Sequence, residues 1–257
     1  LMLTVASWNV NSLKVRLPQV LKWLKANQPD VLGLQELKMQ TEDFPALEFK
    51  ALGYHTIASG QKTYNGVALI SRKPITDVVT DIPGLEDPQR RVLAATIDGI
   101  RIINLYVVNG EAVGSEKFAY KLTWLDALLK WVAAEMAAHD KVIVMGDFNI
   151  APDDRDVYDP KAWEGKVPCS EDERNRLRSL LELGLVDTFR LHEQPPETFS
   201  WWDYRAASFR RNRGLRIDLV LASKALSDHC SRAWIDREPR TWERPSDHAP
   251  VVAEFSI

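Results

Sequence analysis

The chain has 257 residues, 45% of them hydrophobic, which is enough to build one large buried core. Its formal net charge of −3 argues against a general polyanion-binding protein, so any nucleic-acid surface has to be a local basic patch. The two cysteines, Cys169 and Cys230, lie far apart, which argues against a disulfide scaffold and a structural zinc site. The sequence shows no signal-peptide pattern and no apolar run of transmembrane length, so we expect a soluble cytoplasmic protein.

The predicted strands are short runs rich in valine, isoleucine and leucine, a composition typical of buried strands. In chain order they are Leu3–Trp8, Val31–Leu34, Val67–Ser71, Val92–Ile97, Ile102–Val108, Val142–Met145, Ile217–Ala222 and Val251–Phe255. Helices and strands do not alternate strictly, and the residues between Ile97 and Ile102 form a tight glycine-bearing turn. This order favours mixed or antiparallel sheets over a parallel one.

Three helices are predicted between these strands. The first has an apolar face of Leu17, Val20, Leu21 and Leu24 and ends near Asn27 and Pro29. The second is a long amphipathic segment, Lys121–Met136. The third opens with Ser170-Glu171-Asp172-Glu173, a capping-box signature, and runs to Gly184. No linker, repeat or low-complexity tract interrupts the chain, so we expect a single domain, residues 2–257.

Polar residues stand where several of the predicted strands end, and a rigid sheet can hold such groups as a site. Candidate metal ligands among them are oxygen donors, which suit a hard cation such as Mg²⁺ or, as a substitute, Mn²⁺. These donors are Asn9, Glu36, Asp147, Asn149 and Asp247. His248 follows Asp247 directly, so one loop can deliver a ligand and an imidazole suited to proton transfer or phosphate contact.

Further residues fit the chemistry of a phosphate ester. Asp218 lies in an apolar strand and needs a polar partner, which makes it the candidate carboxylate that orients His248. Tyr106, Asn109 and Asn149 offer neutral donors to a phosphate or a leaving group. Each residue taken alone is more simply explained as a turn former, a strand aromatic or a surface charge. The tripeptide Ser-Asp-His occurs twice, and we interpret the first copy, Ser227–His229, as part of a short structural helix.

The order of these motifs resembles the exonuclease III family of apurinic/apyrimidinic (AP) endonucleases, within the DNase-I-like phosphodiesterases. The matching segments cover nearly the whole chain. They include Trp8–Ser12, Pro29–Val31, Gln35–Lys38, Asn65–Ala68, Tyr106 to Gly110, Gly146–Pro152, Leu185–Arg190, Phe199–Trp202, Gly214–Asp218 and Pro245–Pro250. The resemblance implies a four-layered α/β sandwich, with two packed mixed sheets flanked by helices and the site at one edge.

The resemblance also implies roles for individual residues. Glu36 would be the main ligand, and one or two metal positions would be completed by Asn9, Asp147, Asn149, Asp247 and His248. Tyr106 and Asn149 would contact the scissile phosphate, and Asp218 would orient His248. Either Asp147 or His248 would activate water.

The predicted DNA surface centres on the basic run Arg205, Arg210, Arg211, Arg213 and Arg216, interleaved with Tyr204 and Phe209. Weaker candidate contacts are Asn11, Lys38, Lys62, Arg90, Arg91 and Asn109. The resemblance places an apolar pocket for an abasic sugar at Trp201, Leu215 and Ile217. Residues 165–170 lie at its lip and are expected to influence which DNA end or lesion enters.

The resemblance therefore predicts a Mg²⁺-dependent DNA-repair nuclease that hydrolyses phosphodiester bonds in duplex DNA. The expected substrates are nicks, 3′ ends and abasic sites, with 3′-to-5′ exonuclease and 3′-phosphodiesterase activity preferred over abasic cleavage. We expect a monomer associated with DNA and no membrane partner. The alternatives are a phosphatase or phospholipid phosphodiesterase of the same fold, and a non-catalytic DNA-binding relative.

Overall fold

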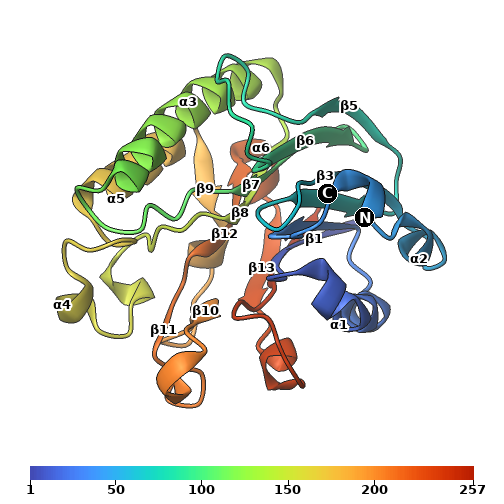
Figure 1. Cartoon of the computed structure of the whole chain (residues 1–257). Coiled ribbons are helices and arrows are strands. Elements are labelled where there is room, and N and C mark those ends of the chain that lie inside the picture. Colours follow the sequence, from blue (N-terminus) through green and yellow to red (C-terminus); the bar gives the residue numbers. More distant parts are fainter.

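The computed structural model describes residues 1–257, and its centre is a pair of six-stranded β-sheets (Figure 1). Sheet A has the strand order β13 (Cys230–Ile235), β14 (Val251–Ser256), β1 (Met2–Asn9), β2 (Val31–Gln35), β4 (Val67–Ser71) and β3 (His55–Ser59). Sheet B has the order β5 (Ile75–Val79), β6 (Val92–Ile97), β7 (Ile100–Tyr106), β8 (Val142–Asp147), β12 (Asp218–Ser223) and β9 (Leu185–Asp187). A separate two-stranded ribbon joins β10 (Trp201–Trp202) to β11 (Gly214–Leu215).

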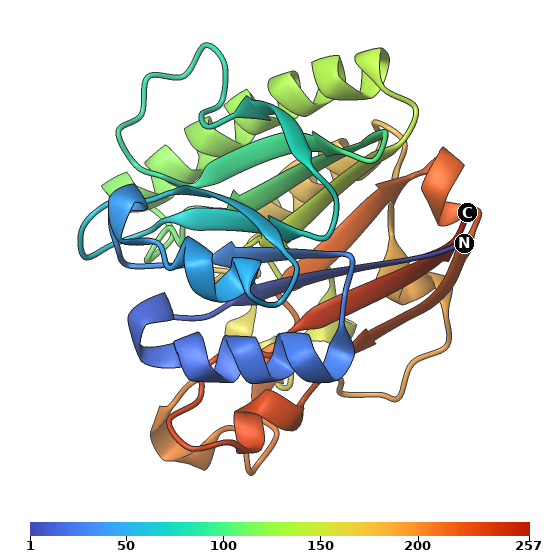
Figure 2. The same ribbon diagram turned by 90° about the vertical axis from the view of Figure 1, so that its right-hand side faces the viewer.

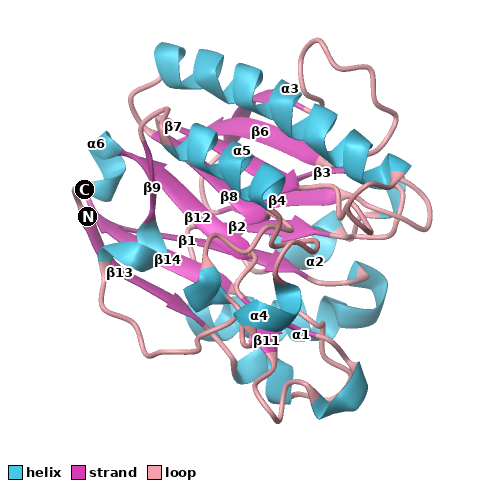
Figure 3. Cartoon of the chain, turned by 90° about the vertical axis from the view of Figure 1, so that its left-hand side faces the viewer, coloured by secondary structure: helices cyan, strands magenta, loops and turns pink.

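Helices cover the outer face of each sheet. Against sheet A lie α1 (Leu13–Asn27) and α2 (Ala46–Lys50), and Figure 2 views the molecule from their side. Against sheet B lie α3 (Glu116–Ala138) and α5 (Glu171–Leu181), which cross its strands in Figure 3. Two one-turn helices, α4 (Pro160–Trp163) and α6 (Lys224–Ser227), stand in connections. The predicted four-layered α/β sandwich is confirmed. No helix has the length and apolar character needed to cross a membrane.

Three buried clusters hold these layers together, because side chains of a strand alternate between its two faces. Along β1, Val5 faces the core between the sheets, where it joins Ile102 and Met145 of sheet B. The next residue, Ala6, faces α1 and packs in the cluster that includes Leu24. The third cluster seals α3 and α5 onto the outer face of sheet B.

A buried polar link also joins the two sheets. The side-chain amide of Gln35 donates to Asn104 Oδ1 at 2.8 Å, and the Asn104 amide donates back to the carbonyls of Leu34 (3.0 Å) and Ala68 (2.9 Å). Gln35 and Asn104 are fully buried, so these bonds replace hydration that both side chains lose. Gln35 precedes Glu36 directly, and the link therefore fixes sheet A against sheet B next to the polar strand ends.

Strand directions bring those polar ends together. Each sheet contains one parallel pair, β1 with β2 and β7 with β8, and all other pairs are antiparallel. Parallel neighbours end at the same edge, so Asn9 pairs with Gln35, and Tyr106 pairs with Asp147. Antiparallel β12 begins at that edge, where Asp218 pairs with Asp147. The site therefore forms at one edge of the sandwich and draws residues from both sheets.

The eight predicted strands correspond to β1, β2, β4, β6, β7, β8, β12 and β14, with ends shifted by at most two residues. The sequence did not predict β3, β5, β9 and β13, which are the edge strands of the two sheets. The three predicted helices are present as α1, α3 and α5, and Ser170 caps the start of α5 with the predicted capping box to Glu173. The first Ser-Asp-His copy begins at Ser227, the last residue of α6, so it stands at the end of the short helix that was expected there.

Candidate active site

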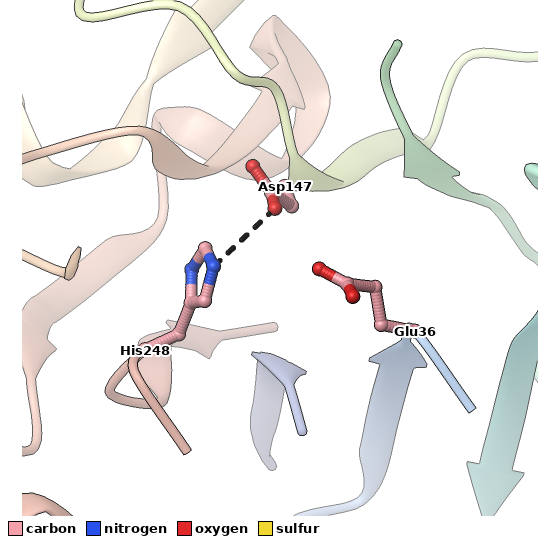
Figure 4. Close-up of side chains that lie close together, drawn as sticks. All are labelled: Glu36, Asp147 and His248. Atoms are coloured by element: carbon pink, nitrogen blue, oxygen red, sulfur yellow. Dashed lines mark ion pairs between the residues drawn. The ribbon is translucent and has the colours of Figure 1, made fainter. Parts of the chain in front are cut away.

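The centre of the site is a cluster of two carboxylates and one imidazole from distant parts of the chain. Glu36 follows β2, Asp147 ends β8, and His248 precedes β14. Each offers one ligand atom to a group whose atoms lie within 4.8 Å of one another (Figure 4). The Nε2 atom of His248 lies 3.6 Å from Asp147 Oδ2, the pair that Figure 4 marks.

Asn9 connects the two carboxylates. Its side-chain nitrogen donates to Glu36 Oε1 and to Asp147 Oδ2, both at 2.9 Å. Its side-chain oxygen accepts from the backbone N–H of Asn11 at 3.0 Å. Asn9 is fully buried and thus aligns the two carboxylates, while its own oxygen is engaged within the chain.

His248 is held in one orientation by Asp218. Its Nδ1 atom lies 2.8 Å from Asp218 Oδ2, and both side chains are buried. Burial alone would lower the pKa of His248, but the carboxylates of Asp218 and Asp147 outweigh it and raise that pKa well above the ordinary value. The predicted pairing of Asp218 with His248 is thus present in the structure, and it leaves Nε2 directed at the cluster.

The charge balance of the cluster suits a cation. Burial raises the pKa of Asp147 to about 7, against the opposing effect of His248. One carboxylate oxygen each of Asp218 and Asp247 is buried without a hydrogen-bond partner. Closely spaced carboxylates with free oxygens are the donor set of a hard divalent ion, and the residues present therefore fit the metal that the sequence predicted.

Asp247 links this centre to the predicted lesion pocket. Its Oδ2 atom accepts from the indole N–H of Trp201 at 3.1 Å, and its Oδ1 atom lies 3.9 Å from His248 Nε2. Trp201 is partly buried and packs beside the apolar cluster that contains Leu215 and Ile217. Asp247 therefore lies between the carboxylate–imidazole cluster and the residues predicted to form the lesion pocket.

Tyr106 stands on the sheet B side of the centre. Burial and the nearby carboxylates of Glu36 and Asp147 raise the pKa of its phenol well above the ordinary value. The Arg91 guanidinium lies 4.9 Å from the ring centroid and also donates to the Tyr106 carbonyl at 3.2 Å. The phenol therefore remains protonated at neutral pH and is available as a hydrogen-bond donor.

Two asparagines complete this side. Asn149 adopts a left-handed backbone conformation (φ 48°), and its side-chain amide donates to the carbonyl of Val107 at 2.8 Å. Asn109 is exposed, and its amide nitrogen lies 3.5 Å from Asn149 Oδ1. The loops after β7 and β8 thus place both amides beside the carboxylate cluster.

Four of the predicted DNA-binding arginines, Arg205, Arg210, Arg211 and Arg213, are exposed on the connection between β10 and β11. This connection contains a one-turn 3₁₀ helix, Arg205–Ala207, and projects at the end of the molecule where β10 and β11 lie in Figure 1. The arginines Arg237 and Arg240 lie 4.8 Å and 4.7 Å from the ring of Phe209 within it. Arg240 also donates to the Ser246 carbonyl at 2.9 Å, which ties the connection to the His248 loop.

The prediction that Arg216 contacts DNA is wrong. Arg216 is 1% exposed, and its guanidinium forms ion pairs with Asp156 and Asp187, each at 2.7 Å. A second arginine, Arg190, also forms an ion pair with the Asp156 carboxylate, at 2.6 Å. The charge of Arg216 is neutralised inside the protein and is not available to phosphate.

The weaker candidate DNA contacts stand on both sides of the centre. Lys38 is exposed and donates to Asn11 Oδ1 at 2.7 Å, close to Glu36. Lys62 is exposed in the loop before β4, whereas Arg90 and Arg91 are partly buried, and Arg90 pairs with Asp81 at 3.3 Å. The structure therefore brings Lys38 and Asn11 to the centre directly.

Several residues of this site were not predicted from the sequence. The hydroxyl of Ser200 accepts a hydrogen bond from the backbone N–H of Asp218 at 3.1 Å, and the hydroxyl of Ser246 accepts one from the backbone N–H of His248 at 3.2 Å. Lys121 is buried behind Asn109 and Asn149. The sequence offers one indication of the role of Lys121, its place on a helix that packs against a sheet. The residues next to Lys121 in the sequence did not indicate which groups its ammonium would contact.

Comparisons with known proteins agree with this geometry. The model of the Endonuclease/Exonuclease/phosphatase family matches residues 6–248. Exodeoxyribonuclease III of Haemophilus influenzae is 37% identical over 262 aligned residues, covering 97% of this chain and 98% of that protein.

Two solved structures superpose over the whole chain. A 3′ phosphatase from Neisseria, bound to product DNA hairpin, is 50% identical with a TM-score of 0.98 and covers 99% of this chain and 100% of that one. An AP endonuclease from Archaeoglobus fulgidus is 37% identical with a TM-score of 0.95 over the same shares of the two chains. The predicted resemblance is confirmed: the chain belongs to the Endonuclease/Exonuclease/phosphatase family, among the relatives of exodeoxyribonuclease III.

Proposed function

We propose that this protein is a Mg²⁺-dependent DNA-repair nuclease that hydrolyses phosphodiester bonds at the 3′ ends of duplex DNA, and at abasic sites as a secondary substrate. The observation that supports it most is the cluster of Glu36, Asp147 and His248 within 4.8 Å, with Asp218 behind the imidazole. This arrangement has every group that phosphodiester hydrolysis needs, which argues against a non-catalytic relative.

The oxygen-rich donor set favours Mg²⁺ over softer metals. Glu36 and Asp147 would hold the ion, with Asp247 and Asn149 beside them, in one or two positions. The bound ion would polarise a phosphoryl oxygen and stabilise the developing charge.

The side chains supply orientation and proton transfer. Asn9 bonds Glu36 and Asp147, and Asp218 leaves Nε2 of His248 facing Asp147, where we expect the phosphate to bind. Asp147 and His248 are the two groups placed to accept the proton of the attacking water. The Tyr106 phenol and the Asn149 amide would donate to the phosphate oxygens as the leaving group departs.

The exposed arginines support duplex DNA as the substrate. An acidic protein needs a concentrated positive surface to approach phosphates, and Arg205, Arg210, Arg211 and Arg213 provide one on a single connection. Lys38 and Asn11 extend this surface to the centre. The same chemistry would keep the protein on cellular DNA, and we propose that it acts there as a monomer, with residues 2–257 forming one functional unit.

The preference for 3′ ends rests on the pocket. Leu215 and Ile217 are 1% and 4% exposed and pack with Cys169 of the lip segment. A tightly packed wall leaves little room for a base-free sugar turned out of a continuous duplex, whereas a terminal phosphate or nucleotide needs no such space. The 50% identity to a Neisseria 3′ phosphatase supports the same preference.

Rates on two duplexes test this proposal. One carries a nick with a 3′-phosphate or a recessed 3′ nucleotide, and the other carries an internal abasic site. With Mg²⁺ present, we expect release of the 3′-terminal group to be faster than cleavage at the abasic site. After chelation of the metal with EDTA, we expect no reaction on either duplex. An abasic cleavage rate equal to 3′ release would overturn the preference, and activity on phosphoinositides without any on DNA would overturn the proposed function.

A further inference from the structure

Lys121 is a fully buried lysine whose ammonium group lies behind the active-site loops. It is 0% exposed, although it stands near the start of the amphipathic helix α3. Its Nζ atom donates to the backbone carbonyl of Asn109 at 3.0 Å and of Asn149 at 2.6 Å. Its third partner is the Glu173 carboxylate of α5. Three donors of one ammonium therefore meet three acceptors on three different segments.

The two carbonyls belong to loops with unusual backbone conformations. Asn149 has φ 48°, and Gly110, directly after Asn109, has φ 90°. A Cβ atom built on Gly110 would lie 2.8 Å from the side chain of Lys121, so the loop passes close over the lysine stem. Asparagine adopts the left-handed region more readily than other side chains, but contacts to the backbone still decide whether it stays there. The bond from Lys121 to the Asn149 carbonyl is such a contact.

Glu173 connects this lysine to the lip of the pocket. It is the third residue of the capping box, and its Oε1 atom accepts from the Ser170 hydroxyl at 2.7 Å. Ser170 follows Cys169, which packs against Leu215 and Ile217. Lys121 and Glu173 thus join the loops after β7 and β8 to the start of α5.

We propose that Lys121, paired with Glu173, is a positioning residue for phosphate contact: it holds the backbones of Asn109 and Asn149 so that their side-chain amides face the scissile group. Lys121 itself does not touch DNA, because its ammonium is buried and all three donors are used. This inference rests on the proposed function, in which the Asn149 amide donates to the phosphate.

The alternative is a purely structural ion pair, and the chain offers a matched control for it. Arg101 and Glu135 form a second buried pair at the opposite end of α3, with 5% and 13% exposed side chains and an Nε–Oε2 distance of 3.0 Å. Arg101 bonds the carbonyl of Asp77 and no residue of the site. Loss of either pair loosens α3, but only loss of the first frees the two asparagine loops.

The experiment compares two double variants, Lys121→Met/Glu173→Gln and Arg101→Met/Glu135→Gln. Neither variant leaves an unpaired buried charge, which would unfold the protein for an unrelated reason. We expect similar decreases in Tm for both. For the Lys121 variant we also expect roughly a 100-fold lower kcat with a KM for nicked DNA within about threefold of wild type, because the misplaced amides act mainly on the transition state. The Arg101 variant should keep kcat within about twofold.

Equal kcat losses in the two variants, or an unchanged kcat in the Lys121 variant, would overturn the inference. If the methionine variant does not fold, Lys121→Gln/Glu173→Gln keeps polar groups at both positions and is judged by the same kcat criterion. A second readout needs no substrate: the side-chain amide NMR signals of Asn109 and Asn149 should shift in the Lys121 variant and stay in place in the Arg101 variant. Unmoved signals would refute the positioning role even if the wild-type protein cuts no DNA.

Discussion

The carboxylate–imidazole centre and the arginine connection between β10 and β11 carry the two halves of the proposed function, and they are built in opposite ways. The centre is buried and its side chains hold one another, as Asn9 does for Glu36 and Asp147. The connection is exposed, and stacking of Arg237 and Arg240 on Phe209 secures its base while its own arginines point to solvent.

The difference between the two regions shows which of them has to be rigid for its role. Chemistry depends on placing a few atoms accurately, and a group fixed before the substrate arrives needs no reorganisation during the reaction. Attraction to a phosphate backbone is long-ranged and tolerant of geometry, so exposed charges on a short connection suffice. Changes in the first region should therefore affect kcat, and changes in the second should affect binding and its dependence on salt.

The largest expected effect comes from Asp147→Asn, which keeps the shape of the side chain and removes its charge. The variant should lose at least about 1,000-fold in kcat, as expected when a principal catalytic group is removed. Its affinity for nicked DNA should stay within a few-fold of wild type. Single-turnover rates and a fluorescence binding titration measure the two effects, and retention of more than a tenth of the activity would contradict the assigned chemistry.

An intermediate effect is expected for Arg216→Met, and it concerns stability. Removing the guanidinium leaves the buried Asp156 carboxylate with Arg190 as its one remaining ion-pair partner and leaves the partly buried Asp187 without its partner, so we expect a loss of about 3 kcal/mol in the free energy of unfolding, the lower end for breaking a buried pair. Urea denaturation measures this loss. The slope of log K for DNA binding against log salt should remain that of wild type, because Arg216 contacts no phosphate. A smaller slope in the variant would mean that Arg216 does contact DNA.

The smallest effect is expected for Arg210→Gln/Arg211→Gln. Each side chain that neutralises a phosphate contributes about 0.9 to the magnitude of the slope of log K for DNA binding against log salt. With both side chains replaced, that magnitude should decrease by about 1.8. Stability and kcat at saturating DNA should not change. Lys224→Gln/Arg232→Gln removes two charges at the far ends of β12 and β13 from the site and serves as the control. An equal slope change in both variants would mean that general charge, and not this connection, attracts DNA.

The eight strands that composition predicted are the interior strands of the two sheets, and the four that it missed are the edges. The reason is physical. Interior strands such as β4 are buried on both faces, and β4 is apolar except for Ser71 at its end. The edge strands β5 and β13 are half exposed and mix polar with apolar residues. Dense apolar runs thus identify the centre of a sheet better than its borders.

The site shows a similar division. The clustered carboxylates Glu36 and Asp147 and the Asp218–His248 pair could be predicted because the order of motifs along the chain indicates them. The fate of Arg216 could not, since its partners Asp156 and Asp187 lie at positions that only the folded chain brings together. Of five arginines close together in the sequence, four are exposed and one is buried. The pattern of charges along the sequence does not distinguish the buried arginine from the exposed ones.

The position of β14 has a consequence for the order of folding. In sheet A, β14 lies between β13 and β1, and its pairing with β1 joins segments that are far apart in the sequence. Such long-range pairing has a large cost in loop-closure entropy before any contact compensates for it. We therefore expect the loop that carries His248 to take its place only after this pairing has formed, so that the imidazole joins Glu36 and Asp147 late in folding.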